Sequence, residues 1–367
     1  METARRLSRT VTQLLELHPA SLYRASMADL VADAPALLEG LTEAALIASC
    51  GRVVAANSAA HTLLGEGIEG VAVADVISHP AAIEALERGG RDWGEGVELT
   101  GLGGSRRHWL MRVALLSDGT SLVRLVDRSE ARAAEQMRVD FVANASHELR
   151  TPLATLIGYT ETLREQMGEI DPATRAKFLS VVHDEARRMQ RVVEDLISLS
   201  RIEAEKFTTP TKAIGLELLI DQALEGERRT AEERGSVFIR NLAPHLPRIA
   251  GDAGQILQLL DNLLSNALRY GEPGTPVAVT AVSEGPMVRL SISDQGEGIA
   301  PEHIARVTER FYRVDTSRSR SLGGTGLGLS IVKHIVERHR GRLSIDSELG
   351  KGTTVHVLLP AAGSDAS

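Results

Sequence analysis

The sequence predicts a multidomain α+β protein made of a small mixed α+β module, a two-helix hairpin and an α/β sandwich. Its length of 367 residues exceeds what one core usually fills, because single hydrophobic cores rarely grow beyond roughly 250 residues. Short apolar runs broken by glycine dominate the early part of the chain, and two long stretches of helical periodicity follow. The last part alternates helix-like and strand-like segments, as a sandwich of one sheet and one helical layer does.

The composition is that of a globular protein that does not bind nucleic acid directly. Hydrophobic residues make up 43% of the chain, and the formal net charge is −8, whereas a nucleic-acid partner requires a basic face. Cys50 is the one cysteine, which excludes an intramolecular disulfide and suits a reducing cytoplasm. No run reaches the ~20 apolar residues of a membrane span. We therefore expect a soluble, cytoplasmic chain with no membrane span, or the soluble part of a membrane-anchored parent.

The N-terminal segment, residues 1–36, is predicted to be helical because Leu7, Val11 and Leu14 recur at the spacing of one helix face. Residues 37–128 then contain short apolar runs separated by glycine, a pattern typical of short strands. The expected strands are a hairpin at 45–57 and runs at 96–99, 108–116 and 121–126, with Asp118-Gly119 as the turn between the last two.

The string GRVVAANSAAHTLLG, which begins at Gly51, resembles the start of a PAS sensor domain, where a tight hairpin leads into short helices. The resemblance implies that residues 37–128 are a PAS-like sensor domain. An unrelated α+β module is the alternative that these residues leave open.

Residues 129–140 are predicted to be a helical linker, because they are charged and alanine-rich without Gly or Pro. The linker continues into residues 141–207, which hold two long helices separated by a turn at Asp171-Pro172. Two amphipathic helices cannot bury both of their apolar stripes alone, so we expect a homodimer built on a four-helix bundle. A monomeric hairpin packed against the other modules is the alternative. The stripes comprise Met137, Phe141, Ala145, Leu149, Leu153 and Leu156 or Ile157 in the first helix, and Phe178, Val182, Met189, Val193, Leu196 and Leu199 in the second.

Residues 215–361 are predicted to form the α/β sandwich. Helices are expected at 255–270 and 329–338, and strands at 277–282, 288–292, 343–345 and 353–359.

His147 is the first candidate catalytic residue. It lies two positions from both Ala145 and Leu149 of the apolar stripe, and two helical steps of about 100° turn its imidazole roughly 200° away from that stripe, toward solvent. Thr151, one turn along, shares the exposed face. An exposed histidine is usually unremarkable, but here a carboxylate, Glu148, is adjacent, and Pro152 stands inside a helical pattern, where proline costs a hydrogen bond.

The string SHELRTPL around His147 resembles the phosphoacceptor box of the sensor histidine kinases of two-component signalling. The resemblance implies that an imidazole nitrogen of His147 is phosphorylated and that Glu148 accepts the proton of the other nitrogen. A neutral imidazole is the form needed for attack. In families with the pattern HExxT, the polar residue orients a hydrolytic water, which implies that Thr151 serves dephosphorylation of the partner protein. The alternative is that Thr151 only eases the kink before Pro152.

A polar stripe on the helix at 255–270 supports a nucleotide site. Asn262, Asn266 and Arg269 are spaced i, i+4 and i+7, so amide oxygens that suit Mg²⁺ and a cation that suits phosphate fall in one line. The string DNLLSNALRY, which ends at Tyr270, resembles the N box of the same family. The resemblance implies that Asn266 binds the metal. The family more often has Lys in place of Arg269, a change that keeps the charge.

Two glycine-rich motifs follow. In DQGEGI, Asp294 stands at a strand end, where a carboxylate can accept the exocyclic amine of adenine, and Gly296 and Gly298 permit a close backbone approach. The second motif is expected to cradle phosphates with its amides and the following helix N-terminus. Its residues are Gly323, Gly324, Thr325, Gly326, Leu327 and Gly328. Phe311-Tyr312-Arg313 and a charged, serine-rich stretch expected to act as a lid lie between the two motifs.

Five motifs therefore stand in the order typical of the sensor histidine kinases, over about residues 141–361. The resemblance implies an ATP-binding fold shared with DNA gyrase, ATP and Mg²⁺ as cofactors, autophosphorylation of His147, and transfer to an aspartate of a cognate response regulator in a phosphorelay. One alternative is a relative that phosphorylates serine on another protein, although that class lacks the two-helix module. The other is a non-enzymatic dimer hub in which ATP only sets conformation.

Overall fold

The computed structural model describes residues 35–88, 96–104, 106–117, 120–166, 170–205, 208–314 and 324–363. The chain divides into two compact units, with the boundary between Val139 and Asp140. Residues 1–34 of the helical segment expected at 1–36, the Asp118-Gly119 turn and most of the expected lid lie outside the described residues. None of the described helices is both long and apolar enough to cross a membrane.

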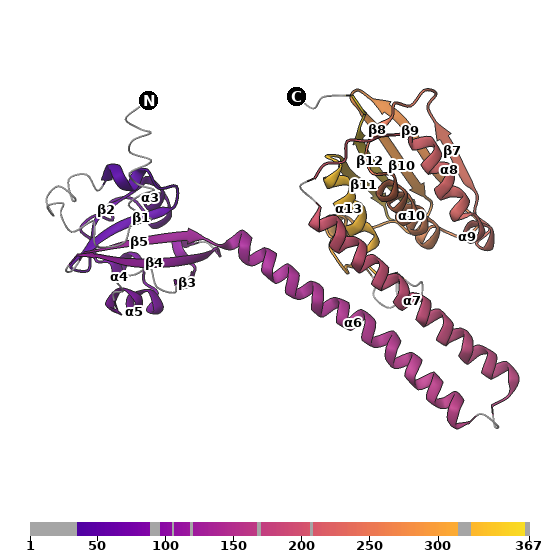
Figure 1. The fold of residues 1–367 in the computed structure, drawn as a ribbon, viewed down its shortest axis with the longest axis horizontal. Helices are drawn as coiled ribbons and strands as arrows, with labels where there is room; N and C mark the ends of the chain where they lie inside the picture. The colour runs from indigo at the N-terminus through magenta and orange to yellow at the C-terminus, as the bar shows by residue number, and fades with distance from the viewer. Residues whose placement is uncertain are drawn as a thin grey trace. The chain divides into compact units, whose positions relative to one another are not determined.

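The first unit is a five-stranded antiparallel sheet with short helices between its second and third strands (Figure 1). The strand order is β2-β1-β5-β4-β3. The strands are β1 (Ala44–Ser49), β2 (Arg52–Ala56), β3 (Val97–Thr100), β4 (His108–Ser117) and β5 (Thr120–Asp127), and the helices are α3 (Ser58–Leu64), α4 (Val73–Val76) and α5 (Pro80–Arg88), with a 3₁₀ turn, η2, at Leu102–Gly104. The expected hairpin and later strands are confirmed, whereas the PAS identity of this unit remains a prediction.

Asn57 fixes the junction between the β1–β2 hairpin and α3. Its side-chain oxygen accepts hydrogen bonds from the backbone amides of Ala45 (3.0 Å) and Ala60 (2.9 Å), so it caps the helix and ties it to β1. Its side-chain nitrogen donates to the carbonyl of Glu43 at 2.8 Å. The buried amide therefore satisfies backbone groups from three segments at once.

A helical hairpin of α6 (Ser129–Glu165) and α7 (Pro172–Ala204) follows the sheet. The helix start expected at Asp171-Pro172 is confirmed, because the Asp171 carboxylate accepts the amides of Ala173 (2.9 Å) and Thr174 (3.0 Å). Near the tip of the hairpin, Tyr159 meets Phe178 edge to face, with ring centroids 4.9 Å apart.

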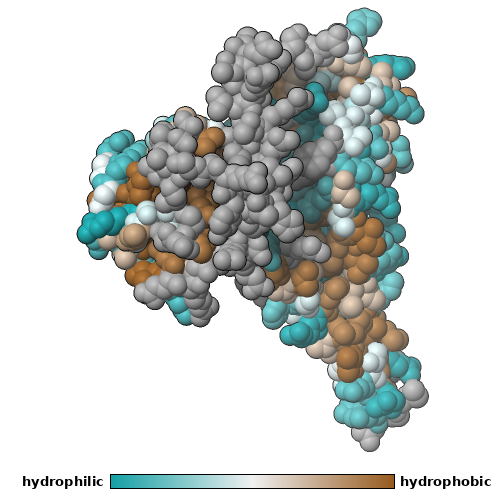
Figure 2. All heavy atoms as spheres, turned by 60° about the vertical axis from the view of Figure 1, so that its left-hand side comes forward, coloured by the Kyte–Doolittle hydropathy of each residue, from teal (hydrophilic) through white to brown (hydrophobic). Residues whose placement is uncertain are grey.

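Much of the apolar surface of the hairpin remains uncovered. Apolar residues gather along the two helices above a polar tip (Figure 2). The large side chains that stay between 42% and 56% exposed include Leu153, Ile157, Leu179, Val193 and Ile197. Three other positions of α7 are fully buried, namely Val192, Leu199 and Ile202. One part of the hairpin is thus packed, and another presents an unpartnered apolar face.

The remainder of the second unit is an α/β sandwich, as expected. Its main sheet has the order β11-β12-β10-β9-β7, with β7 parallel to β9 and the other pairs antiparallel. Its strands are β7 (Phe238–Leu242), β9 (Val277–Glu284), β10 (Met287–Asp294), β11 (Arg342–Glu348) and β12 (Gly352–Pro360), and a small second sheet pairs β6 (Ala213–Ile214) with β8 (Ile249–Ala250). The helices are α8 (Leu216–Gly226), α9 (Arg228–Glu233), α10 (Ala253–Tyr270), α11 (Pro301–Ile304) and α13 (Gly328–Arg338).

One hydrophobic core joins the hairpin to the sandwich. The apolar face of α10 is buried against the sheet and the neighbouring helices α8 and α13, as the helical spacing of its leucines predicts. Leu199 and Ile202 at the end of α7 belong to the same core. The second unit therefore brings the end of the hairpin against the sandwich, next to the segments that carry the candidate site (Figure 1).

Candidate active site

His147 is exposed on α6, as its position opposite the apolar stripe predicts. Thr151 is also exposed, and its hydroxyl donates to the backbone carbonyl of His147 at 3.4 Å. The two side chains therefore lie one turn apart on one surface of the helix. Pro152 is buried and lies inside α6 without ending it.

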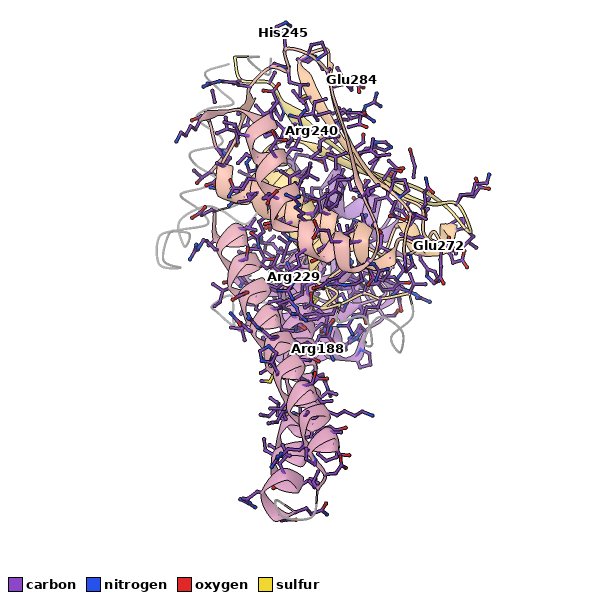
Figure 3. All side chains as sticks on the ribbon, turned by 90° about the vertical axis from the view of Figure 1, so that its right-hand side faces the viewer. Arg188, Arg229, Arg240, His245, Glu272 and Glu284 are labelled. Carbon is purple, nitrogen blue, oxygen red and sulfur yellow. The ribbon has the colours of Figure 1, made fainter. Side chains whose placement is uncertain are left out.

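Glu148 has a different environment from its neighbour. Its carboxylate is bound by the guanidinium of Arg188 on α7 at 3.1 Å and by that of Arg313 from the sandwich at 2.8 Å. Both arginine side chains are more than nine-tenths buried, and Figure 3 shows Arg188 on the hairpin. Glu148, next to the candidate acceptor, is thus the point where α6, α7 and the sandwich meet.

The aromatic motif makes the second contact with α6. The rings of Phe141 and Phe311 are 5.9 Å apart, and the guanidinium of Arg310 lies 5.4 Å from the centre of the Phe141 ring. Phe311 has a positive φ of 61°, and its amide donates to the carbonyl of Gly326 at 2.8 Å. The aromatic motif therefore also holds the second glycine motif in place.

The N-box residues face the start of α13. Asn262 and Asn266 are partly buried on α10. A Cβ atom at Gly328 would lie 3.1 Å from the side-chain oxygen of Asn262 and 3.7 Å from the side-chain nitrogen of Asn266. Arg269, at the end of this stripe, is partly buried, and that burial lowers the pKa of its guanidinium. The structure therefore brings the N box and the second glycine motif together.

A divalent cation fits this donor set only together with its nucleotide. Among the described residues, no group of three or more His, Cys, Asp or Glu side chains could hold a metal ion. The side-chain oxygens of Asn262 and Asn266 are hard ligands, and Mg²⁺ is commonly held by a few protein oxygens together with phosphates and water. The residues present therefore suit Mg²⁺ delivered as a complex with ATP.

Asp294 stands at the end of β10, as expected. Its carboxylate accepts the amides of Gly296 (3.0 Å) and Thr353 (3.3 Å). Burial raises the pKa of Asp294 to about 6, and the two hydrogen bonds oppose that rise. A hollow of about 340 Å³ includes Asp294 in its wall, together with residues of β11 and β12.

The glycines beside Asp294 are required by the protein itself. A Cβ at Gly296 would lie 2.2 Å from the carbonyl oxygen of Tyr270, a half-exposed residue at the end of α10. Gly298 has φ of +72°, and a Cβ there would lie 2.1 Å from the carbonyl oxygen of Glu348. The motif thus packs against protein backbone, a reason that was not visible in the sequence pattern.

The second glycine motif is well buried around its threonine. Gly324, Thr325 and Leu327 are buried. The Thr325 hydroxyl donates to the carboxylate of Asp195 on α7 at 2.8 Å and accepts the amide of Leu327 at 3.2 Å. Gly326 has φ of +74° against the backbone of Phe311. Gly323 lies outside the described residues.

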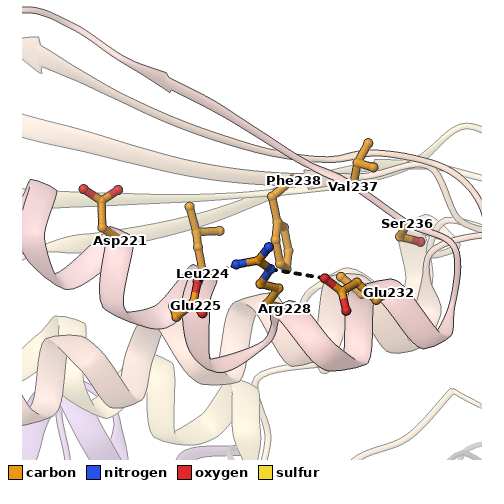
Figure 4. A pocket seen from close by; sticks show the side chains of 9 residues that line it. Asp221, Leu224, Glu225, Arg228, Glu232, Ser236, Val237 and Phe238 are labelled. Atoms are coloured by element: carbon orange, nitrogen blue, oxygen red, sulfur yellow. Dashed lines mark hydrogen bonds and ion pairs between the residues drawn. The ribbon is translucent and has the colours of Figure 1, made fainter.

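A second hollow, of about 360 Å³, shares none of the expected site residues. It lies between α8, α9 and β7, where Arg228 is hydrogen-bonded to Glu232 and Phe238 forms part of the wall (Figure 4). This hollow is slightly larger than the one beside Asp294, but its lining holds none of the sequence motifs. Chemistry rather than size therefore identifies the candidate site.

Sequence reasoning missed Arg188 and Asp195. Both lie on α7, outside every motif, and each contacts a motif residue far away in the sequence: Arg188 reaches Glu148, and Asp195 reaches Thr325. Charged residues are common on a helix of this length, so no local signal distinguishes these two. Only the packing of α7 against α6 and the sandwich reveals them.

Comparisons with known proteins agree with this geometry. The family described as histidine kinase-, DNA gyrase B- and HSP90-like ATPase matches residues 251–363, and the His Kinase A (phospho-acceptor) domain matches residues 137–205. The phosphate regulon sensor protein PhoR of Pseudomonas aeruginosa is 34% identical over 303 residues, which cover 81% of this chain and 67% of PhoR. The sensor protein SrrB of Staphylococcus aureus strain N315 is 39% identical over 240 residues, which cover 65% of this chain and 41% of SrrB.

A solved structure of similar fold is that of the histidine kinase ThkA in complex with the response regulator protein TrrA. It aligns with a TM-score of 0.51 at 19% identity, over 88% of this chain and 96% of that one. At this identity the likeness concerns the fold alone.

Proposed function

The chain belongs to the sensor histidine kinases of two-component systems, and from this premise we propose that it uses Mg²⁺-ATP to phosphorylate His147 and passes the phosphoryl group to an aspartate of a response regulator. The family supplies the ATP-dependent protein-histidine kinase activity. The observation that carries the assignment to His147 is the contact between its neighbour Glu148 and Arg313 of the sandwich. The proposed nucleotide-binding module therefore contacts α6 at the residue next to the proposed acceptor.

The nucleotide would be held by three groups of side chains and backbone. Asp294 accepts the adenine amine, and Gly296 and Gly298 form the backbone beside it, which packs closely against the carbonyls of Tyr270 and Glu348. The amides of the loop from Gly324 to Gly328, with the N-terminus of α13, bind the phosphates. Asn262 and Asn266 hold Mg²⁺, which neutralises charge on the phosphates when bound, and Arg269 adds a positive charge at the end of the stripe. Tyr270 is the last residue of α10, and its carbonyl oxygen lies beside Gly296 of the first glycine motif.

Phosphoryl transfer then needs a neutral, exposed imidazole. One nitrogen of His147 attacks the γ-phosphorus, a nitrogen–phosphorus bond forms, and the bond to the bridging oxygen of ADP breaks. The proton on the other ring nitrogen passes to Glu148. Both guanidinium groups, of Arg188 and Arg313, bind the Oε2 atom of that carboxylate, so Oε1 is the oxygen proposed to take the proton.

The exposed apolar face of the hairpin supports a homodimer. Burying five large apolar side chains against a second copy removes them from water, at roughly 25 cal/mol for each Å² covered. A second copy of a helical hairpin covers such a face as a four-helix bundle.

The response regulator would meet the other surface, where His147 and Thr151 are exposed, and Thr151 would serve its dephosphorylation. Reactions that use ATP and a response regulator place the chain in the cytoplasm, and the first unit would be its PAS-like sensor.

Incubation of the whole chain with γ-labelled ATP and Mg²⁺ tests the proposal. Protein-bound label that is lost in acid and stable in alkali is expected, because a phosphoramidate has this behaviour. A protein that binds ATP but acquires no label would instead be a hub in which ATP only sets conformation. Label that survives acid would point to serine or threonine as the acceptor.

A further inference from the structure

A carboxylate from the hairpin lies against the loop proposed to bind phosphate. Asp195, on α7, accepts the hydroxyl hydrogen of Thr325 at 2.8 Å across 130 positions of sequence. Thr325 belongs to the second glycine motif, and its hydroxyl also accepts the amide of Leu327. The contact therefore joins the hairpin to the backbone loop in front of α13, within the second unit of the chain.

The carboxylate of Asp195 has a hydrogen-bond donor and two positive charges around it. The carboxylate is partly buried, and this burial raises the pKa of Asp195, an effect opposed by the Thr325 hydrogen bond and by the positive charges of Arg269 and Arg191. A buried anion is tolerated where donors and cations replace water. Thr325 belongs to the loop whose amides are proposed to bind the phosphates of ATP, and Arg269 is the cation proposed to act beside them, so the Thr325 hydroxyl lies where a phosphate oxygen would arrive.

We infer that Asp195 competes with the phosphates of ATP for the Thr325 hydroxyl, so that contact between α7 and the glycine loop weakens nucleotide binding. This inference rests on the proposed ATP site. A threonine hydroxyl has one hydrogen to donate, so it cannot serve the carboxylate and a phosphate oxygen at the same time. Two anions beside one loop also repel each other, more strongly where water is partly excluded. Phosphate binding therefore favours separation of Asp195 from the loop.

Other polar pairs hold α7 against the sandwich without involving the glycine loop. Glu203 is bound to Arg310, and Glu205 lies 2.8 Å from the guanidinium of Arg338. These pairs fasten the end of α7 beside the buried Leu199 and Ile202. ATP binding thus opposes the contact between Asp195 and Thr325, while the two ion pairs still hold α7 against the sandwich. Nucleotide binding is thereby coupled to the position of the hairpin.

The test measures the affinity of the full chain for ATP, ADP and adenosine by titration calorimetry. His147→Gln is present in every protein, so that ATP is not consumed. Asp195→Asn keeps the size and the hydrogen-bond acceptor but removes the charge, and Asp195→Ala removes both. Glu203→Gln is the matched control, because it removes a docking charge from the same helix away from the loop.

Asp195→Asn and Asp195→Ala are expected to raise the affinity for ATP and ADP roughly tenfold, the size expected for removing one like charge from a partly screened site. Adenosine should bind with unchanged affinity, and Glu203→Gln should not favour phosphorylated ligands over adenosine. Equal gains for all three ligands, or no gain for ATP in either Asp195 variant, would overturn the inference. A parent protein that binds adenosine but not ATP would instead contradict the proposed phosphate site.

Discussion

At the scale of single residues, the two acids of the proposed site have opposite surroundings. Glu148 is held by two guanidinium groups, whereas Asp294 accepts two backbone amides. Burial outweighs the amides at Asp294, and its pKa rises to about 6. For an acid, a raised folded-state pKa means that the folded chain binds more protons than the unfolded chain between about pH 4 and pH 6. Ionised Asp294 therefore costs stability at neutral pH, and a ligand that donates to it recovers that cost.

Adenosine affinity should therefore fall as the pH is lowered through about 6. If the ionised carboxylate accepts the adenine amine, about one tenth of the protein is competent at one pH unit below the pKa, and the apparent affinity drops about tenfold. Adenosine is used because phosphate groups titrate in the same range. In Asp294→Asn, affinity should be weak and independent of pH between about 5 and 8. The same pH dependence in that variant would assign the titration to another group.

At the scale of elements, α6 presents two side chains with proposed functions on one exposed surface. Thr151 stands one turn beyond His147, with its hydroxyl on the His147 carbonyl at 3.4 Å. This long bond within the helix leaves the hydroxyl accessible to a docked partner. The position suits a reaction on the phosphorylated regulator better than the attack of His147 on ATP.

Thr151→Ala should therefore separate two activities. Self-phosphorylation should stay within about threefold of the parent, while dephosphorylation of the cognate regulator falls roughly tenfold or more. Both rates are measured on the same preparation, and Thr155→Ala, one turn further along α6, is the control for loss of a helix-bound hydroxyl. A similar fall in both activities would indicate a structural role before Pro152, and an unchanged phosphatase rate would refute the assignment.

The elements themselves were largely predictable, and their contacts were not. The leucine spacing of α10 and the alternation of apolar and polar residues in β9 and β10 are local periodicities. These elements therefore lie where the sequence predicted them. The pairs Glu148–Arg313 and Asp195–Thr325 join residues 165 and 130 positions apart. Such pairs depend on how α6 and α7 pack against the sandwich, which periodicity does not encode. The same holds for the glycines of the first motif, whose neighbours are carbonyls of distant segments.

At the scale of the whole molecule, the second unit contains both partners of the proposed reaction. Within one chain, Arg313 contacts Glu148 and Phe311 contacts Phe141, so the sandwich already lies beside the segment that flanks His147. This arrangement favours phosphorylation of His147 by the nucleotide module of its own chain. The exposed apolar face of the hairpin is then left for the second copy.

Mixed dimers test that arrangement. Asn266→Ala should lose most of its labelling, because the proposed metal ligand that would support charge neutralisation is gone. His147→Gln retains the nucleotide site but lacks the acceptor. Heterodimers of the two variants, confirmed by a separate tag on each copy, should stay unlabelled if transfer occurs within one chain. Labelled Asn266→Ala chains in such heterodimers would show transfer between copies, and normal labelling of Asn266→Ala alone would remove the metal assignment.

The most direct measurement compares labelling and ATP affinity in His147→Gln with those of the parent chain. The acceptor is exposed on α6, whereas the proposed nucleotide contacts lie in the sandwich, so the two properties should separate. We predict that acid-labile label falls to background while the affinity for ATP stays within about twofold of the parent value. Acid-labile label that persists in His147→Gln at the parent level would contradict the assignment of His147 as the phosphorylated residue.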